Sequence, residues 1–76
     1  MRELLEFLAR ELVDDPDAVE VVETSDDRGP VLTLTVAPDD MGKVIGRRGR
    51  VAQAIRTVVR ATAAREGAEV NVDIVD

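Results

Sequence analysis

Two groups of residues in this chain have types and spacings that could do chemistry. The first is the run Gly46-Arg47-Arg48-Gly49, in which two glycines bracket two arginines. A glycine has no Cβ atom and therefore lets a phosphodiester approach the main chain closely. An arginine adds a positive charge and a fork of donors that matches a phosphate. We name residues 46–49 the GRRG loop and expect it to bind a phosphate backbone.

The second group consists of three pairs of adjacent aspartates, at positions 14–15, 26–27 and 39–40. Each pair lies beside a predicted helix end or turn, where aspartate commonly serves as a cap or a turn residue. The chain contains no histidine and no cysteine, which removes the usual general base, the thiol nucleophile and the soft metal ligands. We therefore predict no enzymatic activity, no metal site and no cofactor.

The charged residues are strongly segregated along the chain. The net charge is −6, which alone argues against a nucleic-acid ligand because phosphate binding needs cations. However, residues 41–65 contain seven of the ten basic residues and none of the 16 acidic ones. This segment predicts a basic footprint on an otherwise acidic body. The alternative is an exposed helix that happens to be rich in arginine.

The apolar pattern of the first half of the chain predicts a helix followed by a hairpin. Apolar residues recur at helical spacing over residues 2–13, and Pro16 ends that pattern. β-Branched residues then favour strands over residues 18–24 and 31–36, with turn residues at 25–30 between them. We expect these two strands to pair.

The second half of the chain predicts two helices and a strand. Residues 38–40 supply an N-cap candidate for a short helix over 40–45, and the GRRG loop separates this helix from a longer one over 50–66. Gly67 suits the left-handed conformation that follows a helix, and residues 70–74 alternate as a strand does. The order is therefore α-β-β-α-α-β, an α+β fold in which three helices pack on one face of a three-stranded mixed sheet.

The length of the chain allows a single domain over residues 1–76, with one modest hydrophobic core. Since there is no cysteine to form disulfides, we expect self-association to supply additional stability. No apolar run reaches the roughly 20 residues that a membrane span needs, and the first residues do not have the pattern of a signal peptide. We therefore expect a soluble, cytoplasmic protein with no membrane span.

The run Val44-Ile45-Gly46-Arg47-Arg48-Gly49, followed by a helix that contains Ile55, resembles the signature of KH domains. Because a helix and a strand precede the β-α-α-β unit, the order of elements is similar to that of the type II, prokaryotic variety. The chain length, the opening helix with Asp14-Asp15-Pro16, and the run from Pro38 to Gly49 resemble the KhpA family of bacterial proteins with a single KH domain. The resemblance extends over essentially the whole chain.

This resemblance implies a single-stranded RNA ligand, because the loop of such domains clamps the backbone of about four nucleotides. It also implies an RNA chaperone that associates with a second KH-containing protein, KhpB, in post-transcriptional regulation linked to cell-wall synthesis and cell length. The alternative is a KH-fold module for dimerisation or protein interaction, with little RNA binding of its own.

We predict an RNA site centred on the GRRG loop. Its residues are Lys43, Ile45, Gly46, Arg47, Arg48, Gly49 and Arg50. Val36, Val44 and Ile45 are candidates for the apolar wall that faces the bases, and they are equally compatible with the core. Phe7, the only aromatic residue, lies far from the loop along the chain. We therefore expect hydrogen bonds and apolar side chains, and not ring stacking, to contact the bases.

The long helix also predicts self-association. Its mostly apolar arc covers roughly 200° of the circumference, against about 100° or more for an ordinary core-facing helix. We expect part of this arc to stay outside the core and to form the interface of a homodimer, as KhpA-like proteins are thought to do. The candidate interface residues are Ala52, Ile55, Val59 and Ala63. The alternative is that the alanines are simply good helix formers at an ordinary surface.

Overall fold

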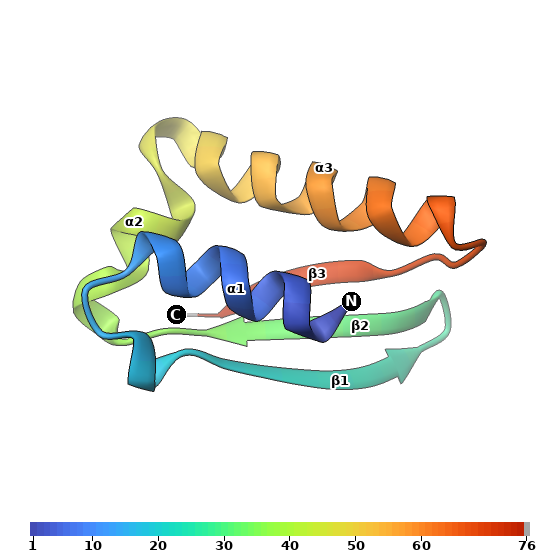
Figure 1. The fold of residues 1–76 in the computed structure, drawn as a ribbon, viewed down its shortest axis with the longest axis horizontal. Coiled ribbons are helices and arrows are strands. Elements are labelled where there is room, and N and C mark those ends of the chain that lie inside the picture. The colour runs from blue at the N-terminus through green and yellow to red at the C-terminus, as the bar shows by residue number, and fades with distance from the viewer. Residues whose placement is uncertain (76) are drawn as a thin grey trace.

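The computed structural model describes residues 1–75, and Asp76 lies outside this range. The helices of the described part are α1 (Arg2–Leu12), α2 (Met41–Ile45) and α3 (Arg50–Arg65), and its strands are β1 (Glu20–Asp26), β2 (Gly29–Thr35) and β3 (Asn71–Val75) (Figure 1). Short 3-10 turns occur at Pro16–Ala18, Pro38–Asp40 and Arg47–Gly49. The predicted α+β fold and its element order are confirmed, with each boundary within two residues of its predicted position.

The three strands form one mixed sheet in the order β1-β2-β3. Strands β1 and β2 are antiparallel, with Val21 opposite Leu34. Strands β2 and β3 are parallel, with Leu32 opposite Val72. The helical crossover between β2 and β3 is long enough to return the chain to the start of the sheet, which is why the parallel pairing could be expected.

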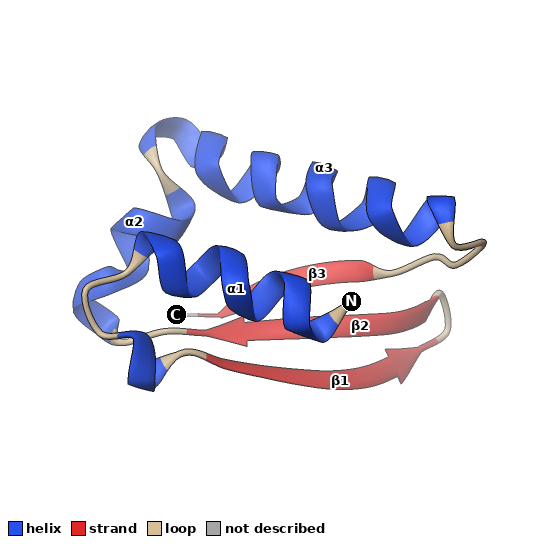
Figure 2. Ribbon diagram, in the orientation of Figure 1, coloured by secondary structure: helices blue, strands red, loops and turns tan. Residues whose placement is uncertain are grey.

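Helices α1 and α3 lie over one face of the sheet, and α2 lies beyond the end of β2 (Figures 1 and 2). The core fills the space between these two layers. Its largest fully buried side chains are Leu5, Leu32, Leu34, Val44 and Val59. In the described part of the chain, no helix covers the opposite face of the sheet, where Val22 is 45% exposed. No helix among residues 1–75 is long and apolar enough to cross a membrane.

The buried side of α3 corrects the predicted dimer interface. Ala52, Ile55, Val59 and Ala63 are each at most 4% exposed, because the chain's own core already covers them. Of the four, only Ile55 lines an accessible surface, a groove on the side of α1, and only a small part of its side chain is exposed there. The accessible part of the apolar arc lies on the side of α1, where Val58 is 44% exposed. The centre of the apolar arc therefore packs in the core, and only its edge beside α1 is accessible.

Helix α3 ends at the glycine that the sequence indicated. Gly67 has a φ angle of 76°, and its N–H donates to the carbonyl of Ala64 at 3.0 Å. The N–H of Ala68 donates to the carbonyl of Ala63 at 2.9 Å. Together these are the two hydrogen bonds of a Schellman motif. The motif ends α3 and lets the chain turn toward the start of β3.

The backbone between α2 and α3 contains three residues with positive φ angles. Gly46 has a φ of 76° and a ψ of 175°, a region that is essentially restricted to glycine. A Cβ atom on Gly46 would collide with the Val51 side chain and would lie 2.8 Å from the Val51 backbone nitrogen. Arg48 and Gly49 have φ angles of 58° and 73°, and a Cβ on Gly49 would meet open space. The fold thus needs Gly46 for its angles and its close packing, and Gly49 for its angles alone.

We expect Val59→Ala to lower the free energy of unfolding by about 2 kcal/mol, because buried methyl groups are lost and a cavity remains. The control is Val22→Ala at a 45% exposed position of the sheet, outside the proposed contacts of the helices, which should lower this free energy clearly less than Val59→Ala does. Urea unfolding followed by circular dichroism measures both values. Equal losses in the two variants would contradict the placement of Val59 in the core.

We also expect Gly46→Ala to destabilise the protein considerably more than Gly49→Ala. The change at Gly49 forces a left-handed conformation on alanine, at a cost of about 1–2 kcal/mol. The change at Gly46 adds a collision with Val51 to an even less accessible conformation, so the total should exceed about 3 kcal/mol. Thermal unfolding of the two variants compares them directly. A Gly46→Ala protein as stable as the Gly49→Ala protein would rule out the close packing described here.

Candidate nucleic-acid interface

The GRRG loop lies at a corner of the fold, where the chain enters α3 (Figure 1). The side chains of Arg47 and Arg48 are exposed, and neither makes a hydrogen bond or an ion pair with another described residue. The backbone beneath them is held by hydrogen bonds from Gly46 N–H to the Gly42 carbonyl (2.9 Å) and from Gly49 N–H to the Gly46 carbonyl (3.2 Å). The structure therefore presents two uncommitted guanidinium groups on a turn of defined shape.

The first turn of α3 adds backbone donors beside these arginines. This helix has 16 residues, begins at Arg50, and has no side chain that caps its N-terminus. The first N–H groups of a helix lack partners within the helix, and the positive end of the helix dipole lies at the same place. The N–H of Arg50 itself donates to the carbonyl of Arg47, so an anion that approaches the GRRG loop meets the N–H groups of the following residues and a favourable field. Arg50, which is exposed, places a further cation at this end.

Lys43, another predicted site residue, is held in ion pairs. Its Nζ atom lies 3.1 Å from Asp14 Oδ2 and 3.4 Å from Asp40 Oδ1. The hydrogen bond that Lys43 donates to Asp14, the negative charge of Asp14, and the hydrogen bond that Lys43 donates to Asp40 raise the pKa of Lys43 above its ordinary value. The lysine therefore remains protonated, but the nearby carboxylates of Asp14 and Asp40 offset its positive charge.

Asp40 ties the segment after α1 to the start of α2. Its side chain is only about 2% exposed, and its Oδ2 atom accepts a hydrogen bond from the N–H of Asp15 at 3.0 Å. Burial opposes ionisation, but the backbone N–H groups of Asp15 and Asp14 and the ammonium of Lys43 outweigh it and hold the pKa of Asp40 below its ordinary value of 3.8. The side chain makes no capping hydrogen bond, so the predicted N-cap role is corrected to this tie between distant segments.

The acidic pair at 26–27 lies in the hairpin between β1 and β2. Asp26 Oδ1 accepts a hydrogen bond from the backbone N–H of Arg28 at 2.8 Å. This is the turn role that aspartate commonly has. Within residues 1–75, no group of three or more acidic side chains is close enough to hold a metal ion.

Two arginines that the sequence analysis did not place in the site lie along β3. Arg56 Nε donates to the carbonyl of Val72 at 3.2 Å, and Arg60 Nη2 donates to Asn71 Oδ1 at 2.8 Å. Because they are four residues apart, both lie on one face of α3. The feature of the sequence that could have identified them is their four-residue spacing within residues 41–65, the segment that has no acidic residue. The position of β3 beside that face is a tertiary feature that the spacing alone does not reveal.

The structure also separates the three candidates for an apolar wall. Val36 and Val44 are buried in the core, at 5% and 0% exposure, so they do not face a ligand. Ile45 is half-buried and directly precedes the GRRG loop. Of the three, only Ile45 is placed where a base could reach it.

An apolar groove with a volume of about 340 Å³ runs between α1 and α3. Phe7 and Leu12 of α1 are 59% and 39% exposed, and Val58 of α3 is 44% exposed. Val58 and Arg60 are two residues apart, which places them about 200° apart around the helix. The groove and the arginines beside β3 therefore occupy opposite sides of α3.

Comparison with known proteins gives a consistent relationship over the whole chain. The family model for the KH domain of KhpA/KhpB matches residues 2–74. A protein from Clostridium acetobutylicum, named RNA-binding protein KhpA, is 52% identical over 99% of this chain and 100% of its own length. Proteins with the same name from Caldanaerobacter subterraneus and Streptomyces coelicolor are 53% and 51% identical, over 99% and 100% of this chain and 100% and 92% of their own lengths.

Among solved structures, the fold is similar to part of Era. The crystal structure of Aquifex aeolicus Era matches with a TM-score of 0.62 at 18% identity, over 96% of this chain and 28% of the Era chain. Era in complex with MgGDPNP and a segment of 16S ribosomal RNA matches with a TM-score of 0.63 at 18% identity and the same coverage. At this level of identity, the likeness concerns the fold alone.

The names of the relatives describe binding proteins and not enzymes, in agreement with the predicted lack of enzymatic activity. The match of the family model to nearly every residue and the identity of about half of the residues to full-length relatives lead to one assignment. This chain belongs to the KhpA/KhpB family of KH domains.

Proposed function

We propose that this protein binds single-stranded RNA by holding its phosphate backbone on the GRRG loop and the first turn of α3. The observation that carries the proposal is the pair Arg47 and Arg48, which are exposed and uncommitted between two glycines at the start of a 16-residue helix. RNA binding is also the function in the name of the relatives. The loop of a KH domain holds about four nucleotides, which fits a site of this size.

The proposed RNA site keeps the seven residues predicted from the sequence: Lys43, Ile45, Gly46, Arg47, Arg48, Gly49 and Arg50. Their proposed roles differ. The glycines let a phosphate approach the backbone, and the three exposed arginines supply charge. The half-buried Ile45 would contact a base. The charge of Lys43 is offset by Asp14 and Asp40, so we assign it a minor part in binding and a larger part in holding α2 in place.

We further propose that a second copy of the chain docks on the apolar groove between α1 and α3, which gives a homodimer. Phe7, Leu12 and Val58 leave apolar surface in contact with water there, and a domain this short gains from burying more of it. The groove lies on the opposite side of α3 from Arg60, so the dimer would leave the basic side of each copy open. A KhpB-like protein could use the same groove to form a heteromer.

The proposed cellular role is that of an RNA chaperone in the cytoplasm. Membership of the KhpA/KhpB family supports action with a KhpB-like partner in post-transcriptional regulation, linked to cell-wall synthesis and cell length. The apolar groove also supports a second candidate function, a module for dimerisation or protein interaction that binds little RNA of its own. The two candidates differ in what happens when the arginines of the loop are reversed in charge.

We expect the double change Arg47→Asp and Arg48→Asp to weaken RNA binding about a hundredfold or more, because two charged donors are replaced by two repelling carboxylates. Aspartate tolerates the left-handed backbone at Arg48, so the free energy of unfolding should change by less than about 0.5 kcal/mol. Filter binding of a short RNA at two salt concentrations measures the effect. The control is Arg2→Asp with Arg10→Asp on α1, which makes the same change in net charge elsewhere. Unchanged affinity and salt slope in the loop variant would exclude the loop as the site.

We expect Val58→Glu to convert the dimer into a folded monomer, because a buried charge at the centre of the interface would lack a partner. Val22→Glu is the matched control, since Val22 has almost the same exposure but follows the buried Val21 along β1, which puts it on the sheet face away from the helices. Light scattering gives the mass of each variant, and circular dichroism reports folding. A wild type that is monomeric at high micromolar concentration, or a Val58→Glu protein that stays dimeric, would contradict the proposed interface.

A further inference from the structure

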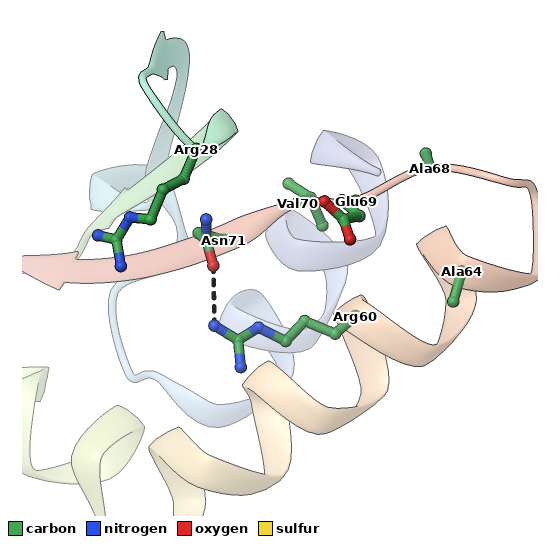
Figure 3. A pocket seen from close by; sticks show the side chains of 7 residues that line it. All are labelled: Arg28, Arg60, Ala64, Ala68, Glu69, Val70 and Asn71. Carbon is green, nitrogen blue, oxygen red and sulfur yellow. Dashed lines mark hydrogen bonds between the residues drawn. The ribbon is translucent and has the colours of Figure 1, made fainter.

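A pocket with a volume of about 540 Å³ lies at the end of the sheet away from α2, where three segments of the chain meet (Figure 3). Arg28 reaches it from the hairpin turn and Arg60 and Ala64 from α3, while Asn71 begins β3 and Val70 directly precedes that strand. A volume of this size lies within the range of small-molecule sites, about 300–1,000 Å³. It can therefore hold a group as large as a nucleotide.

Two guanidinium groups converge on this pocket without an acidic partner. Among residues 1–75, neither Arg28 nor Arg60 forms an ion pair. Arg60 is hydrogen-bonded to the side-chain oxygen of Asn71 at 2.8 Å (Figure 3), which orients its guanidinium without cancelling its charge. The turn also contains Asp26 and Asp27: Asp26 accepts the backbone N–H of Arg28, and within residues 1–75 neither acid forms an ion pair with the Arg28 guanidinium. The pocket thus offers two charged forks of donors to an anion.

One carboxylate reduces the positive electrostatic potential of the pocket. Glu69 also lines the pocket, and Figure 3 draws it beside Val70, whereas the two guanidinium groups are drawn nearer to Asn71. The pocket therefore has a basic part around Asn71 and an acidic part beside Val70. An anion bound near Asn71 gains from both arginines, and it would bind more tightly if Glu69 were neutral.

The basic part of the pocket continues the charged surface that starts at the GRRG loop. Arg60 lies 11 residues beyond Gly49, which corresponds to about 16 Å along the axis of α3. Arg56 lies between them, one turn before Arg60, and its Nε atom is bonded to the Val72 carbonyl of β3 at 3.2 Å. Arginines thus follow the β3 side of α3 from the loop to the pocket. Arg28 extends the row although it lies outside the basic segment of the sequence.

We infer that this pocket is a second phosphate-binding site, which holds the backbone of a bound RNA strand beyond the nucleotides on the GRRG loop. The inference rests on the proposed RNA function. It adds a requirement for the length of the RNA, because a strand must extend past the nucleotides on the loop to reach Arg28 and Arg60. Arginine forks fit a phosphodiester bidentately. The apolar side chains of Ala64 and Val70 provide space for a sugar or a base. A free phosphate or nucleotide carries the same chemistry, and the experiment separates the two sources.

The test compares two RNA lengths in one titration series. Uridine oligomers of four and twelve nucleotides are used because uridine stacks weakly and forms little structure. Arg28 is the residue to change, since its side chain is exposed and makes no hydrogen bond with another described residue. We expect Arg28→Ala to weaken binding of the twelve-nucleotide RNA about three- to tenfold at low salt, and to lower the salt slope by about 0.7. Binding of the four-nucleotide RNA should stay within about 1.5-fold of the wild type, because that RNA does not reach the pocket.

Two further variants complete the comparison. Arg65→Ala removes a charge from the last turn of α3 without touching the pocket, so it should have a clearly smaller effect on the longer RNA than Arg28→Ala. Glu69→Gln should strengthen binding of the longer RNA, because the one carboxylate of the pocket becomes neutral. Adenosine monophosphate is the probe for a free nucleotide and is titrated against the amide signals of Asn71.

The outcomes distinguish the two ideas. If Arg28→Ala leaves the twelve-nucleotide RNA unaffected, or weakens the four-nucleotide RNA equally, the second site on the RNA strand is overturned while the function of the loop stands. If only adenosine monophosphate responds to Arg28→Ala, the pocket serves free nucleotides and the inference also fails. If the wild type binds neither RNA, the proposed function itself is wrong and the inference falls with it.

Discussion

Because β2 and β3 pair in parallel, the chain must travel back along the whole length of the sheet between them. Helix α3 spans this distance, and α2 with the GRRG loop connects the end of β2 to the layer of helices (Figure 1). The loop therefore lies at a corner of the fold, where its side chains have few neighbours. Strand pairing in the sheet thus places Arg47 and Arg48 in solvent at the head of a long helix.

Because α3 connects β2 to β3 across the sheet, three of its sides have different surroundings. Its centre packs on the sheet through residues such as Val59, its β3 side carries Arg56 and Arg60, and its α1 side presents Val58. A helix with only one partner would need a single apolar stripe. This helix lies between a sheet below, a strand edge on one side and a second helix on the other. Its wide apolar arc faces the sheet and α1, and Arg56 and Arg60 face β3.

The element order and the position of the loop could be predicted because their signals are local: apolar period, turn residues, and two glycines at a helix start. Other features depend on contacts between distant segments. Asp40 has the sequence position of a helix cap, yet its partner is the N–H of Asp15, 25 residues away. Arg28 lies outside the basic segment, and only the folded hairpin brings it to the pocket of Arg60. The periodicity of α3 indicated a wide apolar arc, but the position of α1 decides which edge stays accessible.

Helix α3 is one rigid element that begins at the loop and forms one wall of the apolar groove. In the proposed homodimer, two copies joined across their grooves would hold the two proposed RNA-binding loops at a fixed separation. In such a dimer, an RNA bound at one loop would meet the second loop at a high effective concentration, and its avidity would exceed the affinity of either loop without any new contact. A transcript with two accessible single-stranded stretches would be held far longer than a transcript with one. Selection among RNAs could then rest on the spacing of unpaired segments, a property that a single loop of this kind cannot read.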